Sequence, residues 1–137
     1  MGKCVMIERE LMVGSWHVTF LFANNGYEDE LVLTRLYDID APIYIMQEVN
    51  RLMDSCEANC GFTYTNGHMR EAVVLIGPTT SGEEFIDTLV HEVHHLAVAI
   101  AYSVGVDLEG ETPAYISGDS ARELADVVCH FGCPSCN

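Results

Sequence analysis

The sequence predicts an α+β fold: a small domain with helices on one side of a mostly antiparallel sheet. Alternating apolar and polar residues in the first third of the chain indicate strands. An Asn-Gly pair between two further alternating stretches indicates a hairpin in the middle of the chain. Apolar residues at helical spacing dominate the remainder. The expected order of elements is therefore β-β-α-β-β-α-α.

The size and composition of the chain predict one globular domain covering residues 1–137. Hydrophobic residues make up 49% and charged residues 20%, which is typical of folded rather than disordered chains. No apolar run approaches the ~20 residues of a membrane span. The N-terminal residues show no secretory pattern. We therefore expect a cytoplasmic protein without membrane contacts, and the sequence does not predict its oligomeric state.

The first strands are predicted from alternation. Runs 16–23 and 30–37 alternate and are separated by Asn-Gly at 25–26, which favours a hairpin. Residues 4–13 form either a preceding strand that ends at the Gly-Ser pair 14–15 or a short helix.

The next segment changes to helical period. Asp40 is a candidate N-cap, and Pro42 is tolerated in a first turn. Apolar residues then recur at helical spacing at Ile43, Met46, Val49 and Leu52 or Met53.

A second hairpin is predicted with strands near 61–65 and 70–76 around an Asn-Gly pair at 66–67. Its second strand contains the continuous apolar run 72–76. A strand that is apolar on both faces is typical of the interior of a sheet.

Two helices complete the prediction. Thr80 or Ser81 can cap the first helix, with Glu83 or Glu84 completing a capping box, and the helix should end near Gly105. Its broad apolar stripe consists of Phe85, Ile86, Leu89, Val90, Val93, Leu96, Ala97 and Ile100. A last helix is expected over residues 111–129.

The first of these helices carries an H-E-x-x-H motif, formed by His91, Glu92 and His95. The two histidines are four residues apart, so both imidazoles project from one face and can occupy two corners of a tetrahedral zinc site. Glu92 then stands beside the open position, where a carboxylate acts as the general base toward a zinc-activated water. His94 lies off this face, and we interpret it as a bystander.

The alternative interpretation is an ordinary helix with surface histidines. The apolar neighbours Val90 and Val93 argue against it, because they predict a largely buried helix. A buried glutamate beside histidines is costly unless it is paired or close to a metal.

A catalytic zinc site requires a third protein ligand. The downstream candidates are Asp107, Glu109, Glu111, Asp119 and His130. We favour Glu111, which stands 16 residues after His95 in the first turn of the next helix, where that helix can fold back antiparallel. Glu109 and then Asp119 are the alternatives, and an acid that only favours the helix dipole is another explanation of Glu111. Tyr115 shares the face of Glu111 and either donates a hydrogen bond to an oxyanion or packs.

The segments LVHEVHHL and GETPAY resemble the zincin metallopeptidases of the gluzincin kind, in which a glutamate on the following helix is the third ligand. The resemblance is closer to short zincin-like proteins encoded by phages and mobile elements of gut anaerobes. It covers roughly residues 61–137 and implies a zincin fold and metal site. The matching residues are Asp87, Thr88, Leu89, His91, Glu92, His95, Gly110, Glu111, Ala114, Tyr115, Cys129 and His130.

The six cysteines do not indicate a disulfide framework, because no export signal accompanies them. Cys129, Cys133 and Cys136 surround His130 and can serve as metal ligands, form a disulfide or remain thiols. Cys56 and Cys60 can supply the other half of a metal site.

The charge of the chain limits its partners. The net charge is −15, and residues 81–137 contain ten acids and one basic residue. Phosphate backbones are repelled by such a chain, so we expect no direct nucleic-acid binding. The hypotheses are, in order, a zinc-dependent hydrolase acting as a small metallopeptidase on a peptide or protein substrate; a non-catalytic zinc-binding accessory or structural protein of a phage or mobile element; and an acidic DNA mimic.

Overall fold

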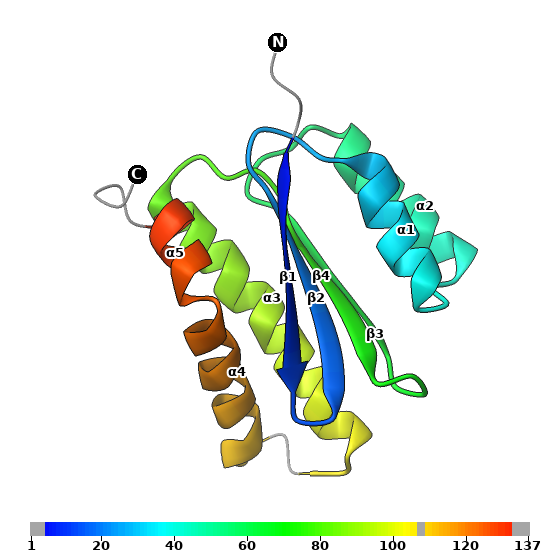
Figure 1. Ribbon diagram of the computed structural model, residues 1–137, viewed down its shortest axis with the longest axis vertical. Coiled ribbons are helices and arrows are strands. Elements are labelled where there is room, and N and C mark those ends of the chain that lie inside the picture. The colour runs from blue at the N-terminus through cyan, green and yellow to red at the C-terminus, as the bar shows by residue number, and fades with distance from the viewer. Residues whose placement is uncertain (1–4, 107–108, 133–137) are drawn as a thin grey trace.

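The computed structural model describes residues 5–106 and 109–132, and these residues form a four-stranded mixed sheet with helices around it (Figure 1). The order of the strands across the sheet is β1-β2-β4-β3. Their bounds are Met6–Val13 for β1, Trp16–Ala23 for β2, Gly61–Asn66 for β3 and Glu71–Ile76 for β4. The two outer pairings are antiparallel and the central pairing of β2 with β4 is parallel, so the expected α+β class is confirmed.

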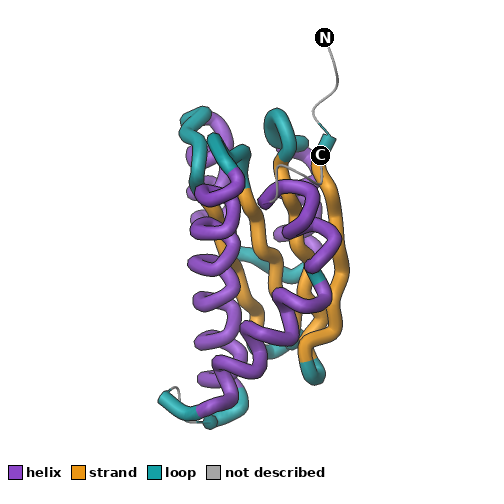
Figure 2. Tube along the Cα trace, turned by 90° about the vertical axis from the view of Figure 1, so that its left-hand side faces the viewer, coloured by secondary structure: helices purple, strands orange, loops and turns teal. Residues whose placement is uncertain are grey.

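Helices cover both faces of the sheet, so the expectation of helices on one side is wrong. One face carries α1 (Asp29–Asp38) and α2 (Ile43–Asp54). The other carries α3 (Gly82–Ser103), α4 (Glu111–Glu123) and α5 (Ala125–Gly132). In Figure 2, which is viewed from the α4 side, α4 and α5 cross in front of the strands.

The central strands require this arrangement because they are apolar on both faces. In β4, alternate residues Val74 and Ile76 face the core under α3, while Val73 and Leu75 face the core under α1 and α2. Residues 72–76 are all buried, which confirms the interior strand expected from the apolar run. Since each face of such a strand gains from burial, the domain forms two separate cores.

The segment 30–37 is the helix α1 and not the predicted strand. Its buried residues Val32 and Leu36 are four apart, which is the spacing of one helix face. The partner of β2 is instead β1, which pairs with it around Gly14 at φ +61°. The left-handed turn at that glycine lets two eight-residue strands pair along their full length, so residues 4–13 resolve as strand from residue 6 onward.

Two helix boundaries also differ from the prediction. Pro42 and not Asp40 occupies the N-cap of α2, because Asp40 adopts φ +58° in the turn before it. The last helix, expected over 111–129, is divided into α4 and α5 at Leu124, whose side chain is fully buried in the core under the sheet.

The helix α3 begins and ends as predicted. The Ser81 hydroxyl accepts a hydrogen bond from the backbone N–H of Glu84 at 3.1 Å, which caps the first turn. Gly105, at φ +73°, follows the last turn. The β3–β4 hairpin is likewise confirmed. Among the described residues, no helix has the length and apolarity needed to cross a membrane.

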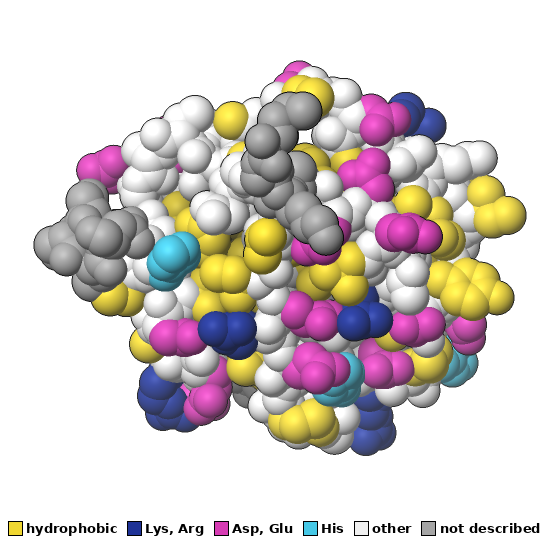
Figure 3. Space-filling model, turned by 45° about the horizontal axis from the view of Figure 1, so that its top comes forward, with side chains coloured by type: hydrophobic (Ala, Val, Ile, Leu, Met, Phe, Trp, Pro, Cys, Tyr) yellow, Lys and Arg dark blue, Asp and Glu magenta, His cyan; other side chains and the backbone are white. Residues whose placement is uncertain are grey.

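Charged side chains of both signs lie interspersed over the end of the molecule shown in Figure 3. Arg9 of β1 pairs with Asp126 of α5 at 3.0 Å. Arg35 of α1 donates two hydrogen bonds to Glu8 of β1, from Nε to Oε2 and from Nη2 to Oε1. These ion pairs connect β1 to a helix on each face of the sheet.

Candidate metal centre

His91 and His95 lie one turn apart on the solvent-facing side of α3, and both are exposed. Their Nε2 atoms are 3.1 Å apart, with the two rings nearly perpendicular at 79°. Two nitrogens bound to one tetrahedral zinc at ~2.0–2.1 Å lie about 3.3 Å apart. The pair therefore fits a single zinc ion, and the same distance also suits a hydrogen bond between two neutral imidazoles.

Glu92 turns from the same helix toward β3 and is only 6% exposed. The Thr63 hydroxyl donates a hydrogen bond of 2.7 Å to Glu92 Oε1. A Cβ added at Gly61 would lie 2.7 Å from Glu92 Cγ, so the carboxylate passes against the backbone of β3 at that residue. The strand thus fixes the carboxylate from two sides, at Gly61 and at Thr63.

The second carboxylate oxygen faces the histidines. Glu92 Oε2 lies 4.0 Å from His91 Nε2, which is too long for a direct hydrogen bond. Both groups line a hollow of about 360 Å³ between α3 and β3. Its walls are Gly61, Phe62, Thr63, Thr65, His91, Glu92, His95 and Ala99.

Glu92 is the one ionisable side chain that is buried among the described residues. The side-chain hydrogen bond described for the carboxylate comes from a neutral hydroxyl. A carboxylate that is mostly withdrawn from water is stabilised by a nearby cation. A cation held by His91 and His95 would stand close to Glu92 Oε2 and supply that stabilisation.

Among the described residues, the structure does not bring a third ligand to the histidine pair. Within 5–106 and 109–132, no group of three or more His, Cys, Asp or Glu side chains is placed to hold a metal ion. Glu111 is the first residue of α4 and is exposed. Its role as third ligand stays a prediction, as does that of Glu109, while Asp107 lies outside the described residues.

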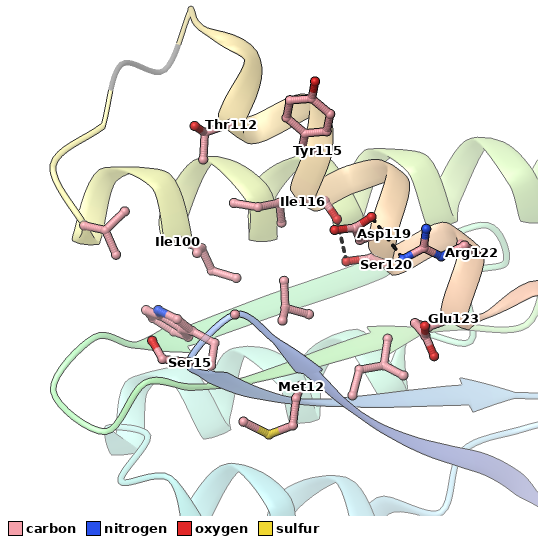
Figure 4. Close-up of a pocket in the computed structure, with 15 residues that line it drawn as sticks. Met12, Ser15, Ile100, Thr112, Tyr115, Ile116, Asp119, Ser120, Arg122 and Glu123 are labelled. Carbon is pink, nitrogen blue, oxygen red and sulfur yellow. Dashed lines mark hydrogen bonds and ion pairs between the residues drawn. The ribbon is translucent and has the colours of Figure 1, made fainter.

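Two other predicted residues lie in a different hollow, between α4 and the β1–β2 hairpin. Tyr115 and Asp119 line this hollow, which is drawn in Figure 4. Asp119 pairs with Arg122 at 3.3 Å. The imidazole of His130, on α5, packs edge-on against the ring of Phe131, with the two ring centroids 4.7 Å apart. The structure therefore does not place the Tyr115 hydroxyl in the hollow that contains His91 and Glu92, and its oxyanion role stays a prediction.

The sequence alone does not indicate that Thr63 and Gly61 belong to the site. Alternation predicts that residues 61, 63 and 65 share one face of a strand, which is the only local signal for them. It does not predict that this strand lies against the histidine helix, because Thr63 is 29 residues from Glu92. That contact is a result of tertiary packing.

The cysteines do not join the histidine pair in the described structure. Cys56 and Cys60 are free thiols in the loop before β3. Burial, and then the neighbouring Glu57 carboxylate, raise the pKa of the Cys60 thiol. Cys129, on α5, is disulfide-bonded, so the disulfide alternative holds for this cysteine. Cys4, Cys133 and Cys136 lie outside the described residues, and a metal role of the C-terminal array stays a prediction.

Comparison with protein-family models, with characterised proteins and with solved structures finds no match to this chain. The site is therefore interpreted from its own residues and their geometry.

Proposed function

We propose that the protein is a zinc-dependent hydrolase that cleaves peptide bonds. His91 and His95 hold the metal, and Glu92 is the general base. The observation that carries this proposal is the position of Glu92: a buried carboxylate, fixed by Thr63, whose second oxygen points toward a pair of imidazoles at zinc-ligand spacing. Two neutral imidazole nitrogens are ligands that zinc prefers, and a carboxylate beside them that does not bind the metal can serve as the base.

In this proposal Glu92, Thr63 and Gly61 each have a separate role. Zinc, when bound, supplies the Lewis acidity that lets a water molecule lose its proton near neutral pH. Glu92 Oε2 accepts that proton, and the hydrogen bond from Thr63 to Oε1 keeps the carboxylate in the orientation that the transfer needs. Close contact with Gly61 leaves the Glu92 side chain little room to turn away from the histidines.

The position of β3 supports an extended peptide as the substrate. This strand is at the edge of the sheet and runs beside the histidine pair. An edge strand presents unpaired backbone N–H and C=O groups, which bind an extended chain by adding it to the sheet. A peptide aligned in this way along β3 would carry its backbone past Glu92.

A zincin-like fold and a third ligand from α4 are parts of the same proposal. α3 contacts β3 and also α4, which follows it in the chain (Figure 1). Glu111 stands in the first turn of α4, on the helix that packs beside the histidine helix. The resemblance of the two sequence segments to zincins agrees with this assignment. In the alternative function, the zinc stabilises the fold or a partner interface and performs no chemistry.

Glu92→Gln separates these two functions. The substitution keeps the shape of the side chain and removes its ability to accept a proton. We expect zinc content, measured by elemental analysis, to stay at about one per chain, and hydrolysis of a peptide library, followed by mass spectrometry, to fall by about 10²–10⁴-fold. Equal hydrolysis by the wild type and the variant would contradict the role of Glu92. A zinc-loaded wild type that cleaves no peptide would favour the non-catalytic function.

A further inference from the structure

A second hollow extends from the histidine pair toward the start of α3. It has a volume of about 310 Å³ and shares Gly61, His91 and Glu92 with the first hollow. Its remaining walls are Leu52, Asn59, Cys60, Asp87 and Thr88. The two hollows meet at His91 and Glu92. A peptide bound across the site would therefore place the residues before and after the cleaved bond in different hollows.

Asp87 gives the second hollow its charge. It lies four residues before His91, so the two side chains share one face of α3. Asp87 is exposed, and in the described part of the chain none of the ion pairs includes it. No lysine or arginine is among the residues that line this hollow. The Asp87 carboxylate is thus accessible to a cation brought by a ligand.

The other walls are neutral. Leu52 is apolar, and the Asn59 amide is engaged with the Thr80 hydroxyl at 3.1 Å. Cys60 hydrogen-bonds through its Sγ to Glu57 at 3.8 Å and remains a thiol. In this hollow the accessible Asp87 carboxylate stands among neutral walls that include the aliphatic Leu52. Such a place suits a long side chain with a cationic end, because the stem packs while the charge pairs.

The first hollow differs in this respect. Beyond the shared residues, its walls are Phe62, Thr63, Thr65, His95 and Ala99, and none of these is an acid. A cationic side chain therefore finds a carboxylate partner on the Asp87 side of the site and none on the other, apart from Glu92 itself.

We propose that Asp87 selects substrates that carry lysine or arginine in the residue occupying the second hollow. This inference rests on the proposed peptide-cleaving function and names its substrate class: basic segments of polypeptide. The net charge of −15 acts in the same direction, since it attracts basic chains at long range.

The test compares alanine-rich peptides that differ only in carrying lysine or norleucine at one position. Norleucine keeps the four-carbon stem of lysine and lacks its ammonium group. Binding is measured by calorimetry to the full-length Glu92→Gln protein in the presence of zinc, so that the readout does not require cleavage. We expect the lysine peptide to bind about fivefold more tightly than the norleucine peptide, the ratio typical of a partly exposed ion pair. We expect this ratio to fall toward one in a protein that also carries Asp87→Asn, which leaves only the weak long-range attraction by the net charge.

Glu83→Gln is the matched control, because Glu83 is exposed one turn earlier on α3 and does not line the hollow. It removes the same charge from the same helix and should leave the ratio at about fivefold. Equal binding of the two peptides, or an unchanged ratio in Asp87→Asn, would overturn the inference. A lysine preference that depends on Asp87 in a protein that cleaves no peptide would support the inference and contradict the proposed function, so the two failures are distinguishable.

Discussion

The two hollows that border α3 on its opposite flanks differ in how their charged groups are compensated. The hollow between α4 and the β1–β2 hairpin is the larger, at about 490 Å³ against about 360 Å³ for the one beside β3. In the larger hollow, Asp119 and Arg122 are mostly exposed and neutralise each other. In the smaller one, Glu92 is buried and hydrogen-bonded to a neutral hydroxyl.

This difference shows that volume alone does not identify the reactive side of the molecule. The larger hollow also contains a buried polar atom, Nε1 of Trp16, which has no hydrogen-bond partner among the described residues. That group is a neutral donor, whose unmade hydrogen bond costs about 1–3 kcal/mol. On the other flank, a carboxylate and two imidazoles lie together, and this is the set of groups that can act on a metal-bound water.

The largest expected effect is loss of the metal on substitution of a histidine. His91→Ala and His95→Ala should each reduce the zinc content from about one per chain to nearly none. They should also abolish the rise in melting temperature on addition of zinc, which at 100-fold excess over Kd corresponds to about 2.7 kcal/mol.

His94→Ala is the control for both variants. His94 is exposed on the same helix but does not line either hollow beside β3. It should keep the zinc content and the thermal shift of the wild type. A loss of zinc as large in His94→Ala as in the other two variants would contradict the assignment of the pair.

Gly61→Ala is expected to act on the base without removing the metal. The added Cβ would lie 2.7 Å from Glu92 Cγ, so the carboxylate has to move. A displacement of ~1 Å at a reacting group costs about 10²-fold in rate. We therefore expect peptide hydrolysis to fall by up to that factor at unchanged zinc content.

Gly67→Ala provides the comparison, because a Cβ at Gly67 meets no atom within 4 Å. Its hydrolysis rate should match that of the wild type. Similar losses in both glycine variants would indicate that changes in the hairpin act on stability and not on Glu92.

Thr63→Val removes the hydroxyl that compensates Glu92 while keeping the shape of the side chain. We expect the free energy of unfolding, measured by urea denaturation without metal, to fall by about 1–3 kcal/mol. Thr63→Ser should recover most of it. Thr65→Val is the control on the same strand, since none of the described hydrogen bonds involves the Thr65 hydroxyl. A Thr65→Val effect as large as that of Thr63→Val would show that the loss is not due to the Glu92 contact.

The smallest effect is expected for Glu8, a carboxylate that lines none of the three hollows and is already paired with Arg35. The hydrogen bond from Arg35 lowers the pKa of Glu8 below its usual 4.5. Its stabilisation is therefore complete above pH 4.5 and is lost as the pH falls through the lowered pKa. Both side chains are about one-third exposed, so Glu8→Gln should cost less than ~1 kcal/mol at pH 7. Denaturation at several pH values checks this; a difference from the wild type that grows as the pH falls would contradict it.

The parts of the fold that depend on local sequence could be predicted, and those that depend on competition between segments could not. α3 is long, has a strong apolar stripe and carries its own cap at Ser81, so neighbouring segments do not change it. The segment 30–37 alternates well enough for a strand, yet β2 pairs with β1 and with β4, which leaves no strand position beside it. Its buried pair Val32 and Leu36 is compatible with a helix, and tertiary packing selects that state.

The candidate site divides in the same way. The spacing of His91, Glu92 and His95 is a local property of a helix, and the structure places the two imidazoles together as that spacing predicts. Thr63 and Gly61 reach Glu92 only because β3 lies at the edge of the sheet beside α3. No spacing in the sequence specifies that arrangement, and for the same reason the sequence leaves the third ligand open among several acids.

The central claim is that the histidine pair of α3, and not a cysteine array, holds the metal. X-ray absorption at the zinc edge of the full-length protein tests it most directly, because it measures the atoms bound to the ion. We expect nitrogen and oxygen ligands only, at ~2.0–2.2 Å from the zinc, with the outer scattering of two imidazole rings. Sulfur ligands at ~2.3 Å without that imidazole scattering would contradict it.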